Sequence, residues 1–432
     1  MRRSGALTLS AVLMLGGVTG GWGDELSGSV GAGAPSSGGF SWPSLPDEWN
    51  WSDLPVRLSA SESVSYNSNI LALPIGTSTT NGLPQGDFTS TSSYGLSTKA
   101  NWYGQQFFFD GSFGVIRYLH ETGFDSNVYS FSPGVNWTLT SRCAGTLVGL
   151  YNKSPSTITE IVGTGINYAT ETSLNETGKC AISNGYSVVF NSSATKTNNS
   201  NPLDALNNAN TEMISAGIEY AKGNGDLTLL ATKSDTNYAS RGAALNTLGL
   251  ANTVVFHNFN LSYTRQINDK LSVTGQLGLV GVTNAFTLGL PKTLLPTYSL
   301  LAAWAITPKV SLSASASRTI APPTTLIGNA EVSYNTVLNL TYQATPKVAF
   351  SASGVAGYSS VAFTSGAAGT ATATVLVPFL TNTKYYALTA GVTYAMTPFI
   401  SAVLSATYNE RVSDHVITSQ DLITVSLNYK PN

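Results

Sequence analysis

Charged residues are scarce in this chain of 432 residues. Lys, Arg, Asp and Glu make up 10% of it, against about 25% in a typical soluble protein. The formal net charge is −2 and no basic block occurs, so nucleic acid is not an expected partner. The sequence also lacks any run of about 18 apolar residues beyond its N-terminal segment, which excludes membrane-spanning helices.

Residues that commonly build catalytic or metal sites are rare as well. The 3 His residues are His120, His257 and His415. They do not show the spacing of metal ligands, and the Gly-rich pieces are not followed by the helix that a phosphate loop needs. We therefore expect no cofactor, no metal and no enzymatic activity. A Ser/His/carboxylate hydrolase remains an alternative, built on His415 and Asp414, or on His120 with Glu121 and Asp125.

Apolar and polar residues alternate through most of the chain, most clearly between Glu331 and Arg411. A period of two is typical of an extended strand with one apolar and one polar face. Four such strands carry aromatic residues eight positions apart: Tyr94 and Trp102, Tyr129 and Trp137, Tyr334 and Tyr342, and Tyr386 and Tyr394. At ~3.3 Å per residue and a tilt of about 40°, eight residues climb roughly 20 Å, close to the apolar band of an outer-membrane barrel. We predict that these eight residues form its aromatic girdles.

The connections between strands alternate in length. Tight turns such as Tyr103-Gly104 and Thr345-Pro346 alternate with long polar loops such as 359–381. Outer-membrane barrels place short turns in the periplasm and long loops outside the cell. The sequence therefore predicts an all-β fold: a transmembrane antiparallel β-barrel of about 18 strands over residues 56–432, in the outer membrane of a Gram-negative bacterium. A soluble β-sandwich is the alternative. Such a fold is not expected to carry four aromatic pairs at one constant spacing on its buried face, so the pattern argues against it.

Two residues fit this pattern badly. Pro133 cannot donate a hydrogen bond to its neighbour, so it predicts a bulge or a local opening of the ladder. Glu62 falls on the lipid-facing row of its strand, which predicts a register change there or contact with the closing strand.

The first 55 residues have a different character. Residues 1–23 combine two Arg, an apolar run and small residues before Asp24, which predicts a signal peptide. Residues 24–55 are rich in Gly, Ser and Pro, so a disordered periplasmic tether is expected. The tether contains Trp42, Trp49 and Trp51. These residues fold into the periplasmic mouth of the barrel or bind a periplasmic partner. The alternative is that they only rest at the membrane interface.

The only two cysteines, Cys143 and Cys180, are predicted at the periplasmic ends of neighbouring strands. In an oxidising compartment a disulfide between them is expected, and unpaired thiols are the alternative.

The face opposite the apolar row would line the lumen. It is mostly Ser, Thr, Asn, Gly and Gln, and the lumen candidates singled out are Lys99, Asn101, Gln106, Phe108, Asp110 and Glu219. Pores that select small ions usually carry rings of charge, whereas a neutral wall suits water and sugar hydroxyls. These residues either guide a solute or only solvate the interior.

Two segments resemble a known family. The opening SASESVSYNSNI (59–70) and the block 104–154, with Gln106, Arg117-Tyr118 and Trp137, are similar to the putative β-barrel porin family that includes EpsL-like exopolysaccharide-operon proteins. The resemblance implies an outer-membrane barrel associated with polysaccharide export. The chain departs from the family at its C-terminus, where Lys430-Pro431-Asn432 follows Tyr429.

Together these features predict a passive conduit for polysaccharide or neutral hydrophilic solutes. The expected partners are outer-membrane lipid and lipopolysaccharide, the barrel-assembly machinery, and periplasmic export components. A closed structural or adhesion barrel with ligand-binding loops is the main alternative, and an outer-membrane hydrolase is the other.

Overall fold

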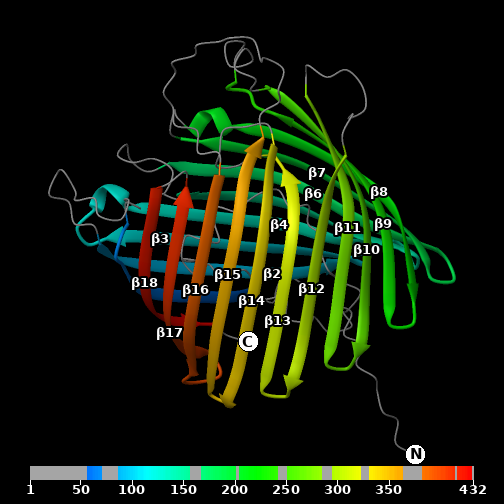
Figure 1. Cartoon of the computed structure of the whole chain (residues 1–432). Helices are drawn as coiled ribbons and strands as arrows, with labels where there is room; N and C mark the ends of the chain where they lie inside the picture. The colour runs from blue at the N-terminus through cyan, green and yellow to red at the C-terminus, as the bar shows by residue number, and fades with distance from the viewer. Residues whose placement is uncertain are drawn as a thin grey trace, which may run out of the picture.

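The chain forms one closed sheet of 18 strands (Figure 1). The computed structural model describes residues 56–70, 86–155, 167–200, 204–241, 251–284, 294–322, 330–362, 382–413 and 416–430. Each strand pairs antiparallel with its neighbours in the chain, and β1 pairs with β18, which closes the barrel. No helix in these ranges is long and apolar enough to span a membrane.

The strands are of similar length. Their bounds are β1 Val56–Asn67, β2 Asp87–Trp102, β3 Gln105–Tyr118, β4 Ser126–Thr140, β5 Cys143–Pro155, β6 Tyr168–Ser183, β7 Tyr186–Asn199, β8 Ala209–Lys222, β9 Gly225–Asn237, β10 Thr253–Asn268, β11 Leu271–Asn284, β12 Leu294–Thr307, β13 Val310–Ala321, β14 Ala330–Thr345, β15 Val348–Ala362, β16 Asn382–Ala395, β17 Ile400–Ser413 and β18 Val416–Tyr429. Two short 3-10 helices, Thr122–Phe124 and Asp204–Asn207, follow β3 and β7. The predicted fold and the predicted number of strands are therefore confirmed.

Tight turns gather at one end of the barrel, where β18 also ends at Tyr429 (Figure 1). Two of them place consecutive residues in the left-handed region: Tyr103 and Gly104 have φ of 47° and 74°, and Asn184 and Gly185 have φ of 20° and 89°. Two-residue turns of this kind match the right-handed twist of the strands that they join. We refer below to this end as the turn end and to the opposite one as the loop end.

The repeated Thr-Pro motif has a physical explanation in these turns. The Thr345 hydroxyl accepts hydrogen bonds from the backbone N–H groups of Lys347 (3.2 Å) and Val348 (3.1 Å). Thr307 and Thr397 accept the same pair of bonds in their own turns. A Thr before each turn therefore satisfies two backbone donors that the ladder leaves free.

The outer face of the barrel carries the apolar row of every strand. Its large side chains are exposed, for example Leu277 (67%), Leu388 (63%) and Leu338 (50%). An exposed apolar surface that continues around a closed sheet is what a barrel surrounded by lipid requires, and the opposite, mostly polar row faces the interior.

Of the two expectations at Glu62, the register change is wrong and the contact with the closing strand β18 is confirmed. Glu62 stays in register with Ser92 on β2 and Leu427 on β18, and it remains on the outer face. Its carboxylate instead accepts hydrogen bonds from the hydroxyls of Ser90 (2.8 Å) and Ser92. These hydroxyls replace part of the hydration that the carboxylate would lose in an apolar surface.

Pro133 produces a local opening of the ladder and no bulge. On the β5 side, pairing stops at Phe131–Tyr151 and resumes at Gly134–Val148 in the same register. The predicted signal peptide (1–23), the tether (24–55) and His415 lie outside the described residues.

Candidate functional site: the barrel interior and its outer girdles

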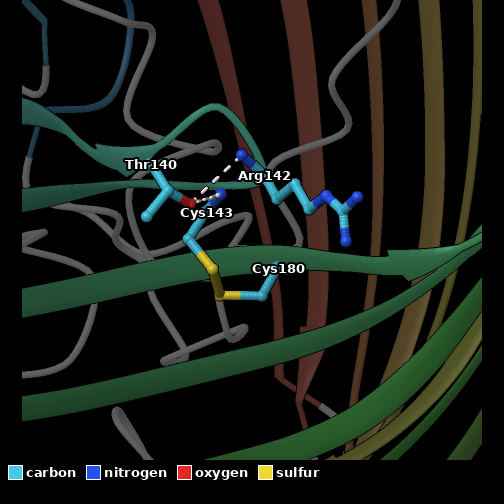
Figure 2. The surroundings of a disulfide bond; sticks show 4 residues. All are labelled: Thr140, Arg142, Cys143 and Cys180. Atoms are coloured by element: carbon cyan, nitrogen blue, oxygen red, sulfur yellow. Dashed lines mark hydrogen bonds between the residues drawn. A yellow bond between two sulfur atoms is a disulfide. The ribbon is translucent and has the colours of Figure 1, made fainter.

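Cys143 and Cys180 form a disulfide at the turn end of the barrel (Figure 2). They lie directly opposite each other on β5 and β6, with 4.1 Å between their Cα atoms. The hydroxyl of Thr140 accepts hydrogen bonds from the N–H groups of Arg142 and Cys143, which fixes the turn beside the disulfide. Cys143 lies on the same face of β5 as the exposed Tyr151, and Cys180 is its direct partner on β6. The disulfide therefore lies on the outer face of the barrel.

The eight predicted girdle aromatics all lie on the outer rows of their strands. Six are well exposed: Tyr94, Trp102, Tyr334, Tyr342, Tyr386 and Tyr394. Tyr129 and Trp137 are partly buried because other aromatic rings pack against them.

Trp137 also belongs to a line of residues that runs across four neighbouring strands, which the sequence pattern does not reveal. Trp137, Gly145, Gly178 and Phe190 are consecutive partners across β4 to β7. The two rings stack with centroids 6.2 Å apart, and a Cβ on Gly178 would lie 2.1 Å from the Phe190 ring. The glycines therefore leave the space in which the two aromatic rings meet.

The predicted lumen residues lie on the interior rows. Lys99 is opposite Phe108, Asn101 is opposite Gln106, and Asp110 is opposite Ser97. Gln106 accepts a hydrogen bond from Asn136 (3.1 Å), and the Phe108 ring covers Gly134. Sequence reasoning missed Arg57, which lies on the same face opposite Ser97 and is exposed at the turn end.

Glu219 is paired inside the barrel. Its carboxylate forms a salt bridge with Lys179, two strands away on β6. Lys179 was also missed, although its place on the polar row of β6 could have identified it. Most charged side chains of the barrel interior thus lie on β1 to β3 and on β6 to β9. Glu171 on β6 and Asp226 on β9 belong to this group as well.

The interior face of β11 to β18 is different in character. Among the described residues of these strands, its only charged side chains are Glu331 and Arg411, both near the loop end. The rest of the wall is mainly hydroxyl and amide groups, including Ser311, Ser313, Ser315 and Ser317 on β13, Asn335, Asn339 and Thr341 on β14, and Ser351 and Ser353 on β15. We call this surface the neutral wall.

Asn339 shows how the neutral wall is held. Its amide nitrogen donates to the Ser313 hydroxyl (3.3 Å), and its amide oxygen accepts from Ser353 (2.7 Å). The side chain remains exposed inside the barrel. Cross-strand bonds of this kind order the groups while leaving hydrogen-bonding capacity for water or a solute.

Accessibility changes along the barrel axis. Many interior side chains near the turn end are exposed, including Arg57, Ser59, Thr138, Ala144, Lys179 and Thr341, although Ser187 is buried. Near the loop end they are buried, including Asp87, Thr236, Glu331, Ser333, Ser359, Thr383 and Ser413. The interior side chains are therefore more exposed toward the turn end than toward the loop end.

An apolar cluster accounts for part of the burial at the loop end. Tyr238, Val254, Phe256 and Val280 pack together, each at most 3% exposed. The Arg241 guanidinium lies 3.5 Å from the centre of the Tyr238 ring. Burial raises the pKa of the Tyr238 hydroxyl, which follows the end of β9, to about 12, so the ring stays neutral at physiological pH.

His120 does not combine with the partners proposed for a hydrolase. Its Nδ1 lies 2.8 Å from the buried carboxylate of Asp87, which sequence reasoning did not connect with it. Asp87 also accepts the backbone N–H groups of His120 and Glu121, so the pair fixes the start of the loop after β3. Asp125 instead faces Arg117 at 3.6 Å. The described residues contain no group of three or more His, Cys, Asp or Glu that could hold a metal ion.

Comparisons with known proteins give a likeness in fold. No protein-family model matches the chain, and no curated protein matches its sequence. Solved structures similar to it include OpdQ of Pseudomonas aeruginosa (11% identity, 88% of this chain, 98% of that one, TM-score 0.45). OprD of the same organism is 12% identical, with 87% of this chain and 95% of that one covered and a TM-score of 0.45. Its OccK3 is 11% identical, with 87% and 96% covered and a TM-score of 0.46. The EpsL-like resemblance finds no support in these comparisons.

Proposed function

We propose that the protein is an outer-membrane pore, a passive conduit for neutral hydrophilic solutes, with polysaccharide as one candidate. The observation that carries this proposal is the neutral wall, together with its exposure toward the turn end. A water-filled lumen removes the cost of bringing a hydrated solute through hydrocarbon. Hydroxyl and amide groups exchange hydrogen bonds with a sugar without the strong binding that would slow its exit.

The location rests on the outer face. Exposed apolar rows, aromatic residues on both sides of them and a closed sheet fit the outer membrane of a Gram-negative bacterium. The barrel-assembly machinery and periplasmic export components would then be partners, and the cysteines would lie in an oxidising compartment.

Liposome swelling tests the proposal. Vesicles that contain the purified protein should swell in neutral mono- and disaccharides faster than in singly charged solutes of the same size. Equal rates for charged and neutral solutes would contradict the role of the neutral wall.

A closed structural barrel is the second candidate, because burial at the loop end favours it. Phe256 is 1% exposed and Arg241 2%, and both lie where a solute would leave the barrel. This candidate predicts no swelling in any solute. Swelling that appears only after Phe256→Ala would identify the apolar cluster as a gate and would retain the pore.

A further inference from the structure

One row on the outer face differs from the apolar rows beneath it. Across β12 to β16 the consecutive strand partners are Tyr298, Arg318, Tyr334, Tyr358 and Lys384. The row lies at the loop end of the apolar band. We call it the cationic row, because two basic residues flank two tyrosines.

Arg318 is held in place by its neighbour. Its Nε donates to the Tyr334 hydroxyl (3.0 Å), and the guanidinium lies 5.6 Å from the centre of the Tyr334 ring. The guanidinium forms no salt bridge with a carboxylate of the described residues. The guanidinium thus has capacity for an anion that the chain itself does not fill.

The tyrosines continue the row toward Lys384. The Tyr334 and Tyr358 rings lie 6.0 Å apart, and the Tyr358 hydroxyl donates to Asn382 (2.8 Å). Lys384 is exposed. Three strand spacings of ~4.8 Å separate Arg318 from Lys384, about 14 Å, so the two cations can engage two anionic groups but cannot share a single one.

An apolar groove begins beside this row. It has a volume of ≈ 450 Å³ and is lined by Leu261, Tyr263, Leu277, Tyr298 and Leu300 around Gly275. A Cβ on Gly275 would meet nothing within 4 Å, so the glycine forms an open floor. The row of Gly275 lies directly on the turn-end side of the Tyr298–Arg318 pair, toward the centre of the apolar band.

No acidic side chain opposes these cations on the outer face of β11 to β16 within the described ranges. Glu331 of β14 faces the interior. Glu410, on the outer row of β17, accepts a hydrogen bond from the Tyr408 hydroxyl (2.6 Å). The patch therefore combines one row of basic and aromatic side chains with an apolar groove on its turn-end side.

We propose that this face binds a phosphorylated glycolipid of the outer leaflet. An acyl chain lies in the groove over Gly275, and the saccharide lies against Tyr334 and Tyr358. Two phosphates pair with Arg318 and Lys384. A glycolipid with a phosphate at each end of a disaccharide meets both cations, whereas a glycerophospholipid with one phosphate meets one. The site goes beyond the pore function and does not depend on which solute the lumen carries.

Lipid binding to the full chain in detergent micelles, measured by native mass spectrometry, tests this site. The probes are a diglucosamine bisphosphate lipid, the same lipid without phosphates, and phosphatidylglycerol. We expect the bisphosphate to bind about tenfold more tightly than either other lipid, the scale of one or two charge-assisted contacts. Arg318→Gln should reduce this preference, and Gly275→Leu should weaken binding by filling the groove.

Two matched variants serve as controls. Arg117→Gln removes another outer-face guanidinium, one that faces Asp125. Gly354→Leu adds a side chain to another outer-face glycine, where a Cβ makes only an ordinary contact with Leu388 (3.5 Å). Neither should change binding of the bisphosphate lipid.

Equal binding of phosphatidylglycerol and the bisphosphate lipid would overturn the proposal. So would an equal loss of bisphosphate binding in Arg117→Gln and Arg318→Gln. A third contrary result is unchanged bisphosphate binding in both Arg318→Gln and Gly275→Leu. If Arg318→Gln fails to fold, as heat-modified migration on a gel would show, Lys384→Gln carries the same test. The side chain of Lys384 is exposed on the outer face, so its replacement leaves the packing of the row in place. Pore activity in swollen liposomes should persist in every folded variant, which separates this site from the proposed function.

Discussion

Cys143 and Cys180 are direct partners in the β5–β6 ladder and are joined by a disulfide on the outer face, 37 residues apart in sequence. The chain passes from β5, which ends at Pro155, to β6, which begins at Tyr168, at the other ends of these strands. A crosslink of this kind acts chiefly by restricting the unfolded chain.

Replacing both cysteines with Ala should therefore lower stability without changing the fold. The chain-entropy relation for a loop of this length gives about 4 kcal/mol. Unfolding in guanidinium of the protein reconstituted in micelles measures the change. Reduction of the wild-type protein should give a similar loss, and equal midpoints for the oxidised and reduced protein would refute the stabilising role.

The glycines under the Trp137–Phe190 stack make a second prediction. A Cβ on Gly145 would lie 2.1 Å from the Thr177 carbonyl oxygen and 2.3 Å from the Trp137 ring. Gly145→Ala should destabilise the barrel by about 1–3 kcal/mol, the usual cost of overpacking. Gly275→Ala is the matched control, because a Cβ there meets nothing within 4 Å. Equal effects of the two substitutions on the unfolding midpoint would disagree with this packing.

Glu62 makes the third prediction, through its two serine donors. Removing the hydroxyls in Ser90→Ala/Ser92→Ala leaves the carboxylate less solvated on the outer face, so stability should fall by about 1–2 kcal/mol. The same pair of substitutions in a Glu62→Leu background should have little effect. The double-mutant cycle isolates the interaction, and a coupling energy near zero would show that the serines do not support Glu62.

Asn339 makes the fourth prediction, which concerns ion selectivity. The side chain is exposed on the neutral wall, so Asn339→Asp should shift the reversal potential in a salt gradient toward cations and Asn339→Lys toward anions. Lys309→Gln changes charge at a tight turn and is the control. Unchanged potentials in both Asn339 variants would place the conducting path elsewhere.

Much of the fold could be predicted because it follows from local patterns. The alternation around Tyr334 to Tyr342 sets the two faces of a strand, and turns such as Thr345-Pro346 set its ends. The interior positions of Lys99 and Asn101 follow from parity alone, because a strand has only two faces.

The other features depend on which strands are neighbours and in what register. The Trp137–Phe190 stack, the salt bridge of Lys179 with Glu219 and the cationic row each reach across three or more strands. Glu62 shows the limit of parity most plainly: a carboxylate on the lipid side suggested an irregular strand, but regular pairing with β2 supplied two hydroxyls instead.

Single-channel recording of the purified full-length chain in a planar lipid bilayer tests the central claim most directly. A barrel with a continuous aqueous lumen and a neutral wall predicts discrete conductance steps with weak preference between cations and anions. A correctly folded, inserted barrel that gives no steps at any voltage would contradict the conduit.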